Sequence, residues 1–149
     1  MPGASHLIVS ALVRHEESLL LVEQQGPWDP QPSWMLPGGR VEPTEPLLAA
    51  LVRELAEETG LALHGLPTIA FGVDLLTVDG WYSALTFDCR GDGVLAPNDP
   101  AGFVRSAAWV PSREAMDRLR LVEWYDCVPI ERYLAGEASP GTVYRMDRT

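Results

Sequence analysis

The stretch Gly39–Leu61, GRVEPTEPLLAALVRELAEETGL, decides the fold of this chain. After two prolines it runs without proline or glycine until Gly60, and apolar side chains recur at helical spacing. This pattern predicts a helix over Pro46–Thr59, with Thr44 or Glu45 as its N-cap and a proline in its first turn, where the missing N–H costs nothing. Gly60 is the expected end of the helix, because glycine adopts the left-handed conformation without strain.

The predicted helix has one apolar face. Four aliphatic side chains fall within an arc of about 100° when each residue advances by roughly 100° around the axis. They are Leu48, Leu51, Val52 and Leu55. We therefore expect this face to pack on a β-sheet.

Three carboxylates lie on a second face of the same helix. Glu54, Glu57 and Glu58 are spaced i, i+3 and i+4, and Glu58 falls at the edge of the apolar stripe. Like charges at this spacing repel, by roughly 0.2–0.5 kcal/mol per pair in isolated helices and by more where water is scarce. A divalent cation would offset the repulsion, and oxygen ligands of this kind suit Mg²⁺ or Mn²⁺. For these three residues alone, a solvated acidic face is the alternative interpretation.

The rest of the chain predicts strands on both sides of this helix. The expected strands are residues 7–13, Ser18–Val22, Thr68–Val78, Trp81–Cys89 and Ala107–Val110, with Asp79-Gly80 as a hairpin turn. Long loops are expected over Gln24–Pro37, which is rich in proline, and over Gly91–Gly102. Two further helices are expected: one capped by Ser112 and ending near Leu119, and one over Glu123–Leu134, weakened by Pro129. This order predicts an α/β fold with a mixed sheet covered by helices on both faces.

Length and charge narrow the class of protein. The 149 residues suit one domain over positions 1–149, and a chain of this size holds a core without disulfide or metal staples. The net charge is −10, and the dispersed arginines form no basic stripe, which argues against a nucleic acid partner. A small anionic substrate remains compatible with the negative net charge, because a bound divalent cation inverts the local electrostatic field.

The sequence also bears on the compartment. No apolar window approaches a membrane span, and two cysteines without a CxxC spacing fit the reducing cytoplasm.

Gly39 and Glu45 stand at fixed distances before the acidic residues of the predicted helix. The string Gly39-x5-Glu45-x7-Arg53-Glu54-Leu55-x-Glu57-Glu58-x-Gly60-Leu61 fits the Nudix box GX5EX7REUXEEXGU at every fixed position, U being a bulky aliphatic residue. The chain therefore resembles the Nudix hydrolases, and the likeness extends to the residues around Trp34 and Trp109. The resemblance implies a Nudix-type α/β/α sandwich with a mixed β-sheet. It also implies a divalent-metal-dependent pyrophosphohydrolase of nucleoside diphosphate-linked (NDP-X) substrates, in which water attacks a pyrophosphate phosphorus.

The same resemblance assigns roles to the residues of the box. It gives as ligands of Mg²⁺ or Mn²⁺ the carbonyl of Gly39 and the carboxylates of Glu54, Glu57 and Glu58. Glu54 would also orient or deprotonate the attacking water. Arg53 and Glu45 would pair and brace the loop against the helix, for which the alternative is an exposed ion pair worth about 0–1 kcal/mol.

Residues outside the box carry weaker signals. Asp99 is the preferred candidate for an additional loop base, against the alternative that Asn98-Asp99-Pro100 is only a turn. The glutamates that many family members carry before the last strand's tryptophan are absent from Gly102–Ala108. Base stacking is an option, beside simple packing, for the three aromatic residues Trp28, Trp81 and Tyr82.

The substrate is predicted only by elimination. The flanking residues that mark hydrolases of ADP-ribose, diadenosine polyphosphates, NADH and coenzyme A are absent, which favours a nucleoside triphosphate or a nucleotide-sugar. Many members of the family are homodimers, so a homodimer is compatible with the resemblance.

Two other classes of function stay open at this point. One is a Nudix-fold sensor that binds a nucleotide without hydrolysing it, although such domains commonly lose box glutamates that this chain keeps. The other is an acidic structural or Ca²⁺-binding protein, which lacks support because the chain has no EF-hand loop and the arginine–glutamate spacing would be unexplained.

Overall fold

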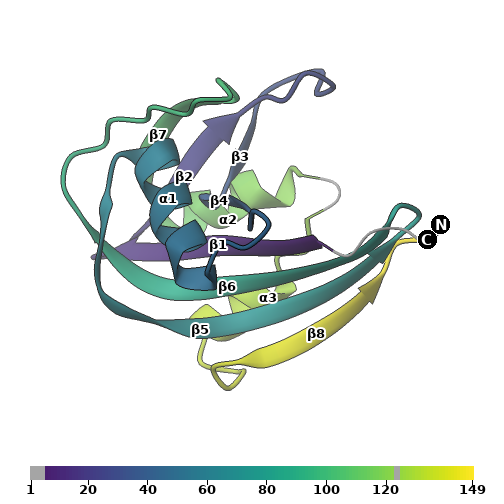
Figure 1. The fold of residues 1–149 in the computed structure, drawn as a ribbon. Coiled ribbons are helices and arrows are strands. Elements are labelled where there is room, and N and C mark those ends of the chain that lie inside the picture. The colour runs from purple at the N-terminus through teal and green to yellow at the C-terminus, as the bar shows by residue number, and fades with distance from the viewer. Residues whose placement is uncertain (1–5, 123–124) are drawn as a thin grey trace.

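The computed structural model describes residues 6–122 and 125–149, and it has strands on both sides of one central helix (Figure 1). The elements are, in order, β1 (His6–His15), β2 (Ser18–Gln24), β3 (Ser33–Met35), β4 (Gly38–Arg40), α1 (Leu47–Thr59), β5 (Ala62–Thr77), β6 (Gly80–Asp92), β7 (Val104–Pro111), α2 (Ser112–Arg120), α3 (Val128–Leu134) and β8 (Thr142–Asp147). The predicted α/β class is confirmed.

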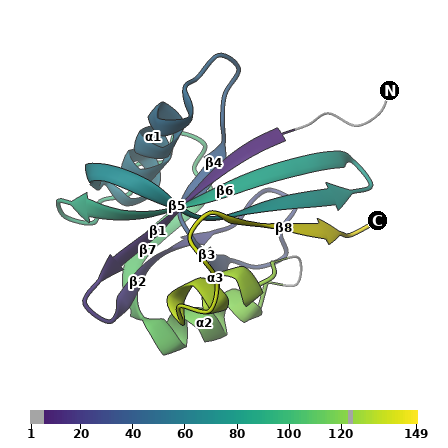
Figure 2. The same cartoon turned by 90° about the horizontal axis from the view of Figure 1, so that it is seen from below.

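The strands form one mixed sheet between two helical layers. The order is β3-β2-β1-β6-β5-β8, with β4 paired to β1 and β7 paired to β2. The β1–β6 and β5–β8 pairs are parallel, and the other pairs are antiparallel. Figure 2 shows α1 on one face of the strands and α2 with α3 on the opposite face. This is the predicted sandwich.

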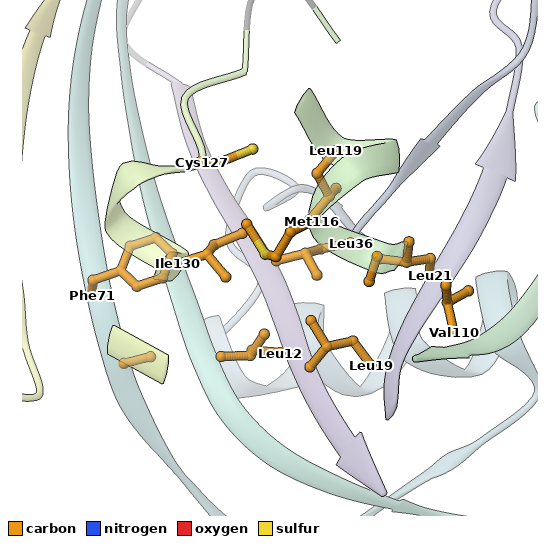
Figure 3. Packing of buried hydrophobic residues seen from close by; sticks show 12 residues of the cluster. Leu12, Leu19, Leu21, Leu36, Phe71, Val110, Met116, Leu119, Cys127 and Ile130 are labelled. Atoms are coloured by element: carbon orange, nitrogen blue, oxygen red, sulfur yellow. The ribbon is translucent and has the colours of Figure 1, made fainter. Parts of the chain in front are cut away.

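Each face of the sheet carries its own apolar core. The core under α1 includes Val9, Leu20, Leu51, Leu55 and Phe87. The core under α2 and α3 includes Leu12, Leu19, Phe71, Met116 and Ile130 (Figure 3). β1 contributes to both cores because successive residues of a strand point to opposite faces. This double packing holds β1, and β4 beside it, in a fixed place relative to α1.

The start of α1 differs from the prediction. The N-cap is Pro46, with an extended backbone and no side-chain hydrogen bond, so neither Thr44 nor Glu45 caps the helix. The carboxylate of Glu45 is engaged elsewhere, because it accepts N–H groups from Arg53 and from the backbone of Glu42. The predicted end is confirmed: Gly60 is left-handed, with φ 79°.

The buried face of α1 is also turned away from the predicted one. Leu51 and Leu55 are buried as expected, but Leu48 and Val52 are 43 % and 44 % exposed. Ala50, Glu58 and Thr59 complete the buried face instead. The helix is held to β4 by polar contacts: the Gly38 N–H donates to Glu58, and Arg53 donates to the Arg40 carbonyl. These contacts turn the helix so that its acidic side, rather than Leu48 and Val52, lies against the strands.

Two of the predicted turns and loops are corrected. The 24–37 segment is not loop throughout, because it contains β3, which pairs with β2. In the β5–β6 hairpin the register joins Thr77 to Gly80, so the two-residue turn is Val78–Asp79 and Gly80 opens β6.

The helices after β7 also begin differently. The Ser112 hydroxyl donates to the Glu17 carbonyl, which links α2 to the β1–β2 turn, and the N-cap of α2 is Pro111. The predicted helix from position 123 begins at Val128, because Pro129 occupies the first turn, where proline is favourable. Positions 123 and 124 lie outside the described residues. β8, in a region that gave no sequence signal, adds a parallel strand beside β5.

No helix within residues 6–122 and 125–149 is long and apolar enough to cross a membrane. Cys89 and Cys127 are buried free thiols. Burial raises the pKa of Cys89 to about 12 and that of Cys127 to about 11, so both thiols stay protonated and unreactive at neutral pH.

Candidate active site

The acidic face of α1 lines a cavity of about 510 Å³. Its acidic lining residues are Glu42, Glu54, Glu57, Glu58 and Asp99. The structure thus brings the three helix carboxylates of the box together with Asp99, which comes from the loop between β6 and β7. Carboxylates gathered in this way are the donor set expected at a divalent cation site.

Arg53 and Glu45 form a bidentate salt bridge across the loop that precedes α1. The Arg53 Nε–Glu45 Oε2 distance is 2.8 Å, and the Arg53 Nη2–Glu45 Oε1 distance is 2.9 Å. The hydrogen-bonded guanidinium lowers the pKa of Glu45 to about 2, and Glu45 in turn raises the pKa of Arg53. Arg53 also donates to Glu54 Oε1 at 2.9 Å and to Glu57 Oε2 at 3.4 Å. This one side chain therefore ties the loop to two of the cavity's carboxylates.

Glu58 is the most buried carboxylate of the cavity, with 6 % of the residue exposed. Its Oε1 accepts the Gly38 N–H at 2.7 Å, which fixes it against β4. Burial raises the pKa of Glu58 to about 8, helped by the nearby charges of Glu54, Asp99 and Glu57, while the Gly38 N–H opposes the rise. Glu58 therefore holds a proton at neutral pH unless a cation compensates its charge.

Glu54 lies against the backbone of Gly39. A Cβ atom at position 39 would stand 2.5 Å from Glu54 Oε1, so a side chain there would displace the carboxylate. Burial raises the pKa of Glu54, and the Arg53 guanidinium opposes the rise. Gly39 is needed here for close approach of the backbone, which is a physical reason for this glycine of the box.

The end of α1 holds the loop that carries Asp99. The Ala96 N–H donates to the Thr59 carbonyl at 2.9 Å, and the Asn98 N–H donates to the Glu57 carbonyl at 2.8 Å. A Cβ atom on Gly60 would stand 2.7 Å from the Ala96 carbonyl oxygen, so glycine leaves room for the loop as well as ending the helix. The helix end therefore places Asp99 beside the acidic face.

Asp99 also organises its own loop. Its Oδ2 accepts the N–H groups of Phe103 and Val104 at 2.9 and 3.0 Å, and its Oδ1 accepts that of Ala101 at 3.2 Å. The Asp99 carbonyl accepts the Gly102 N–H, which closes a turn. The turn alternative is thus present in the structure, and the role of Asp99 as a base stays a prediction.

The donor set fits Mg²⁺ or Mn²⁺ chemically. Among the described residues, no three His, Cys, Asp or Glu side chains already stand as a closed ligand set. Mg²⁺ does not need one, because it is commonly held by one or two carboxylates, with waters and substrate phosphates completing its shell. The raised pKa values of Glu54 and Glu58 fit the same conclusion, since burial disfavours the charge of both carboxylates and a bound cation would compensate it.

A second, larger cavity of about 590 Å³ adjoins the acidic one. Its walls include Ile8 of β1, Phe71 and Val73 of β5, Tyr82 of β6 and Met146 of β8. The described linings of the two cavities share Gln24, Gly38 and Arg40, so the cavities meet at β4 and the end of β2. A mostly apolar pocket of this size suits a nucleoside-sized group.

Arg40 and Glu42 also line the acidic cavity, although the sequence does not single them out. Both occupy variable positions of the box, which the motif alone does not single out. Strand alternation is the signal that could have found them. Residues 38, 40 and 42 lie two apart along β4 and the residues that follow it, and all three line the acidic cavity.

The three predicted stacking residues fall in different places. Tyr82 lines the larger cavity and makes ring contacts with His6 and Arg40. Trp28 is 93 % exposed in the loop between β2 and β3, and Trp81 lies under the Arg145 guanidinium. Neither tryptophan is among the described residues that line these two cavities, so of the three only Tyr82 lies at one of them, and base stacking stays a prediction.

Comparisons with known proteins agree with this fold. The family model of the NUDIX domain matches residues 4–128. The structure of a NUDIX hydrolase from Nitrosomonas europaea superposes with a TM-score of 0.76 at 25 % identity, covering 92 % of this chain and 93 % of that one. This chain belongs to the Nudix family.

Two curated relatives carry named activities. The human 8-oxo-dGDP phosphatase NUDT18 is 41 % identical over 123 residues, which are 78 % of this chain and 37 % of that protein. The CTP pyrophosphohydrolase of Escherichia coli (strain K12) is 39 % identical over 54 residues, which are 36 % of this chain and 40 % of that enzyme. The chain thus aligns with well under half the length of each.

Proposed function

We propose that this chain is a divalent-metal-dependent pyrophosphohydrolase of nucleoside diphosphate-linked substrates. The observation that carries the proposal is the junction of the two cavities at Gly38 and Arg40. A nucleoside in the larger cavity would extend its phosphates across this junction toward Glu54, Glu57 and Glu58. One molecule would then occupy both cavities.

Mg²⁺ or Mn²⁺ would be held by Glu54, Glu57 and Glu58, with the Gly39 carbonyl as a further ligand. The cation would neutralise the diphosphate and lower the pKa of the attacking water.

The chain's own residues prepare the reaction by fixing these carboxylates. Arg53, itself held by Glu45, donates to Glu54 and Glu57 and limits their motion. Gly38 holds Glu58 in the same way. Preorganised charges of this kind need no rearrangement when the reaction occurs.

Glu54 is the residue we assign to the water. The water oxygen attacks phosphorus, the anhydride P–O bond breaks, and the water proton passes to the Glu54 carboxylate while the leaving phosphate departs. Burial raises the pKa of Glu54, which makes it a better proton acceptor than an exposed glutamate.

Nucleoside di- or triphosphates are the substrate class that we favour, with nucleotide-sugars second. The named activities of the two relatives, on 8-oxo-dGDP and on CTP, support this choice. The apolar walls of the larger cavity and Tyr82 suit a base rather than a second highly charged group.

A substrate panel tests the proposal. Released phosphate or pyrophosphate would be measured with Mg²⁺, Mn²⁺ or EDTA, from nucleoside di- and triphosphates with and without 8-oxoguanine, nucleotide-sugars, ADP-ribose and dinucleoside polyphosphates. We expect turnover of one class, only with metal. No turnover of any compound, with a nucleotide still raising the melting temperature, would favour the alternative of a non-catalytic nucleotide sensor.

Three broader expectations belong to the same proposal. Residues 1–149 are taken as one domain that acts in the cytoplasm, where free thiols such as Cys89 and Cys127 persist. The expected partner is the small nucleotide, with no nucleic acid or membrane. A homodimer stays a prediction, and light scattering coupled to size-exclusion chromatography measures it directly.

A further inference from the structure

Arg40 stands where the two cavities meet. It is one of three described residues common to both linings, with Gln24 and Gly38, and it is the only cation among them. Among the described lining residues of both cavities, the other cation is Arg53. A phosphate chain that passes from the larger cavity to the acidic one must therefore pass Arg40.

The guanidinium of Arg53 is already hydrogen-bonded within the protein. Its guanidinium donates to Glu45, Glu54 and Glu57 and to the Arg40 carbonyl, so it has little capacity left for a substrate anion. No carboxylate of the described residues lies within ion-pair distance of Arg40. Its guanidinium lies 5.7 Å from the centre of the Tyr82 ring, and Nη2 is 3.5 Å from the Tyr82 hydroxyl. Such contacts are weak beside a charge-assisted bond to phosphate.

The backbone of Arg40 is fixed while its side chain is not. In β4 the residue pairs with Ile8 of β1, and its carbonyl accepts the Arg53 Nη2–H at 3.2 Å. The side chain is exposed, and its guanidinium contacts the ring and hydroxyl of Tyr82. A change of rotamer can therefore move the guanidinium without moving β4 or the carboxylates.

The surrounding charge explains why a cation is needed at this point. Five carboxyl groups line the acidic cavity, and those that are ionised repel an approaching phosphate. A metal ion held by the carboxylates of α1 would compensate them at the far end of the cavity. At the junction, beside the nucleoside, Arg40 is the residue that can supply positive charge.

We propose that Arg40 binds the phosphate joined to the nucleoside and so positions the anhydride bond between the two cavities. This rests on the proposed function for the direction of the substrate. The ligand chemistry is a phosphate monoester or diester oxygen, which a guanidinium can bind with two parallel N–H groups. Arg40 acts in binding and positioning, and Glu54, Glu57 and Glu58 remain the residues of the chemical step.

Binding of products without metal tests this role separately from catalysis. Dissociation constants of GMP, guanosine, CMP and cytidine would be measured by calorimetry in EDTA, for the wild type, Arg40→Gln and Arg40→Lys. We expect Arg40→Gln to weaken binding of the better monophosphate by about 10- to 100-fold and to leave its nucleoside unchanged. Arg40→Lys would recover part of the loss, because lysine keeps the charge without the paired geometry.

Matched variants distinguish a role of Arg40 in binding from an effect on the fold and from an effect on the chemical step. Arg113→Gln removes an exposed arginine of α2 and should change neither binding nor melting temperature. Glu57→Gln should still bind the monophosphate while losing turnover. With the substrate found by the panel, Arg40→Gln should raise KM by a similar factor and leave kcat within about threefold, since the contact serves binding.

Different results would overturn the role of Arg40 and the proposed pyrophosphohydrolase activity. Monophosphate binding and KM that are unchanged in Arg40→Gln would overturn the role of Arg40, whatever the enzyme hydrolyses. A wild type that binds neither monophosphate in EDTA would overturn it too. A wild type that binds a monophosphate through Arg40 but hydrolyses nothing in the panel would instead overturn the proposed pyrophosphohydrolase.

Discussion

The two adjoining cavities are built in opposite ways. The acidic cavity takes most of its charged residues from one continuous segment, Arg40 to Glu58, on β4, α1 and the loop between them. The larger cavity takes its walls from β1, β2, β3, β4, β5, β6 and β8, that is, from residues between Ile8 and Met146. The first is built mainly on α1 and the segment before it, and the second exists only when most strands of the sheet have come together.

This difference separates the residues expected to act in the chemical step from those expected to select the nucleotide. The helix and its loop fix the carboxylates through Arg53, Gly38 and Gly39, which leaves little freedom for change. The larger cavity can change at many strand positions without disturbing that arrangement. We therefore expect changes in the acidic cavity to affect turnover, and changes in the larger cavity to affect which nucleotide binds.

The largest effect is expected from Glu57→Gln or Glu58→Gln. Each change removes a negative charge from the proposed metal site, so kcat should fall by about 10²–10³-fold while the fold is kept. Steady-state kinetics and circular dichroism measure the two outcomes.

Glu114→Gln is the matched control. Glu114 pairs with Arg118 on the exposed surface of α2, away from both cavities, and its loss should leave kcat unchanged. Turnover near the wild-type level in both box variants would remove the acidic cavity from the mechanism.

A second effect is a dependence of stability on pH that Mg²⁺ reverses. The pKa of Glu58 is about 8 in the folded chain, above its ordinary value of 4.5. The unfolded chain therefore loses this proton first, so the contribution of Glu58 to stability is greatest below pH 4.5 and declines as pH rises to about 8. Mg²⁺ favours the ionised form and should stabilise the chain more at pH 8.5 than at pH 5.5. At 10 to 100 times its Kd it adds about 1.4–2.7 kcal/mol.

Urea unfolding at several pH values, with Mg²⁺ or EDTA, measures this effect. Glu58→Gln should flatten the decline seen in EDTA, because glutamine does not titrate. A decline of equal size in that variant would assign the pH dependence to other groups.

A smaller effect is expected in the larger cavity. Tyr82→Leu should raise KM for the nucleotide by about 3- to 10-fold through loss of an aromatic contact, with kcat nearly unchanged. Trp81→Leu is a matched control, because Trp81 is the neighbouring aromatic and is not among the described residues of either cavity. A KM that responds to Trp81 but not to Tyr82 would place the nucleoside elsewhere.

The smallest effect is expected at Trp28. Its side chain is almost fully exposed, so Trp28→Ala should change the free energy of unfolding by less than about 0.5 kcal/mol and leave KM unchanged. A marked rise in KM would mean that the loop between β2 and β3 closes over the substrate. The nucleoside site would then include Trp28 in addition to the residues that line the larger cavity.

The same contrast explains what the sequence could predict. The acidic cavity follows from spacing, because positions on one helix share a face whatever the rest of the chain does. Glu54, Glu57 and Glu58 were found in this way, whereas the pairing of Arg53 with Glu45 was expected from the resemblance to the Nudix hydrolases. The larger cavity has no local pattern, since Phe71, Tyr82 and Met146 become neighbours only through the order of the strands.

Local errors arose where tertiary contacts overrode local preference. Leu48 and Val52 fit the apolar arc, but hydrogen bonds from α1 to β4 turn the helix and leave them exposed. Ser112 has the chemistry of an N-cap, but its hydroxyl is used by the Glu17 carbonyl. In each case a partner distant in sequence decided the outcome.

Dependence of turnover on Mg²⁺ tests the central claim most directly. Wild type and Glu57→Gln would be stripped with EDTA, desalted and titrated with Mg²⁺ at a fixed, saturating concentration of the best nucleotide. We expect wild-type turnover to rise from background to a plateau, and Glu57→Gln to stay about 10²–10³-fold lower even at saturating Mg²⁺. Full wild-type turnover in EDTA, or equal plateaus in the two proteins, would contradict a metal-dependent hydrolase acting through the carboxylates of α1.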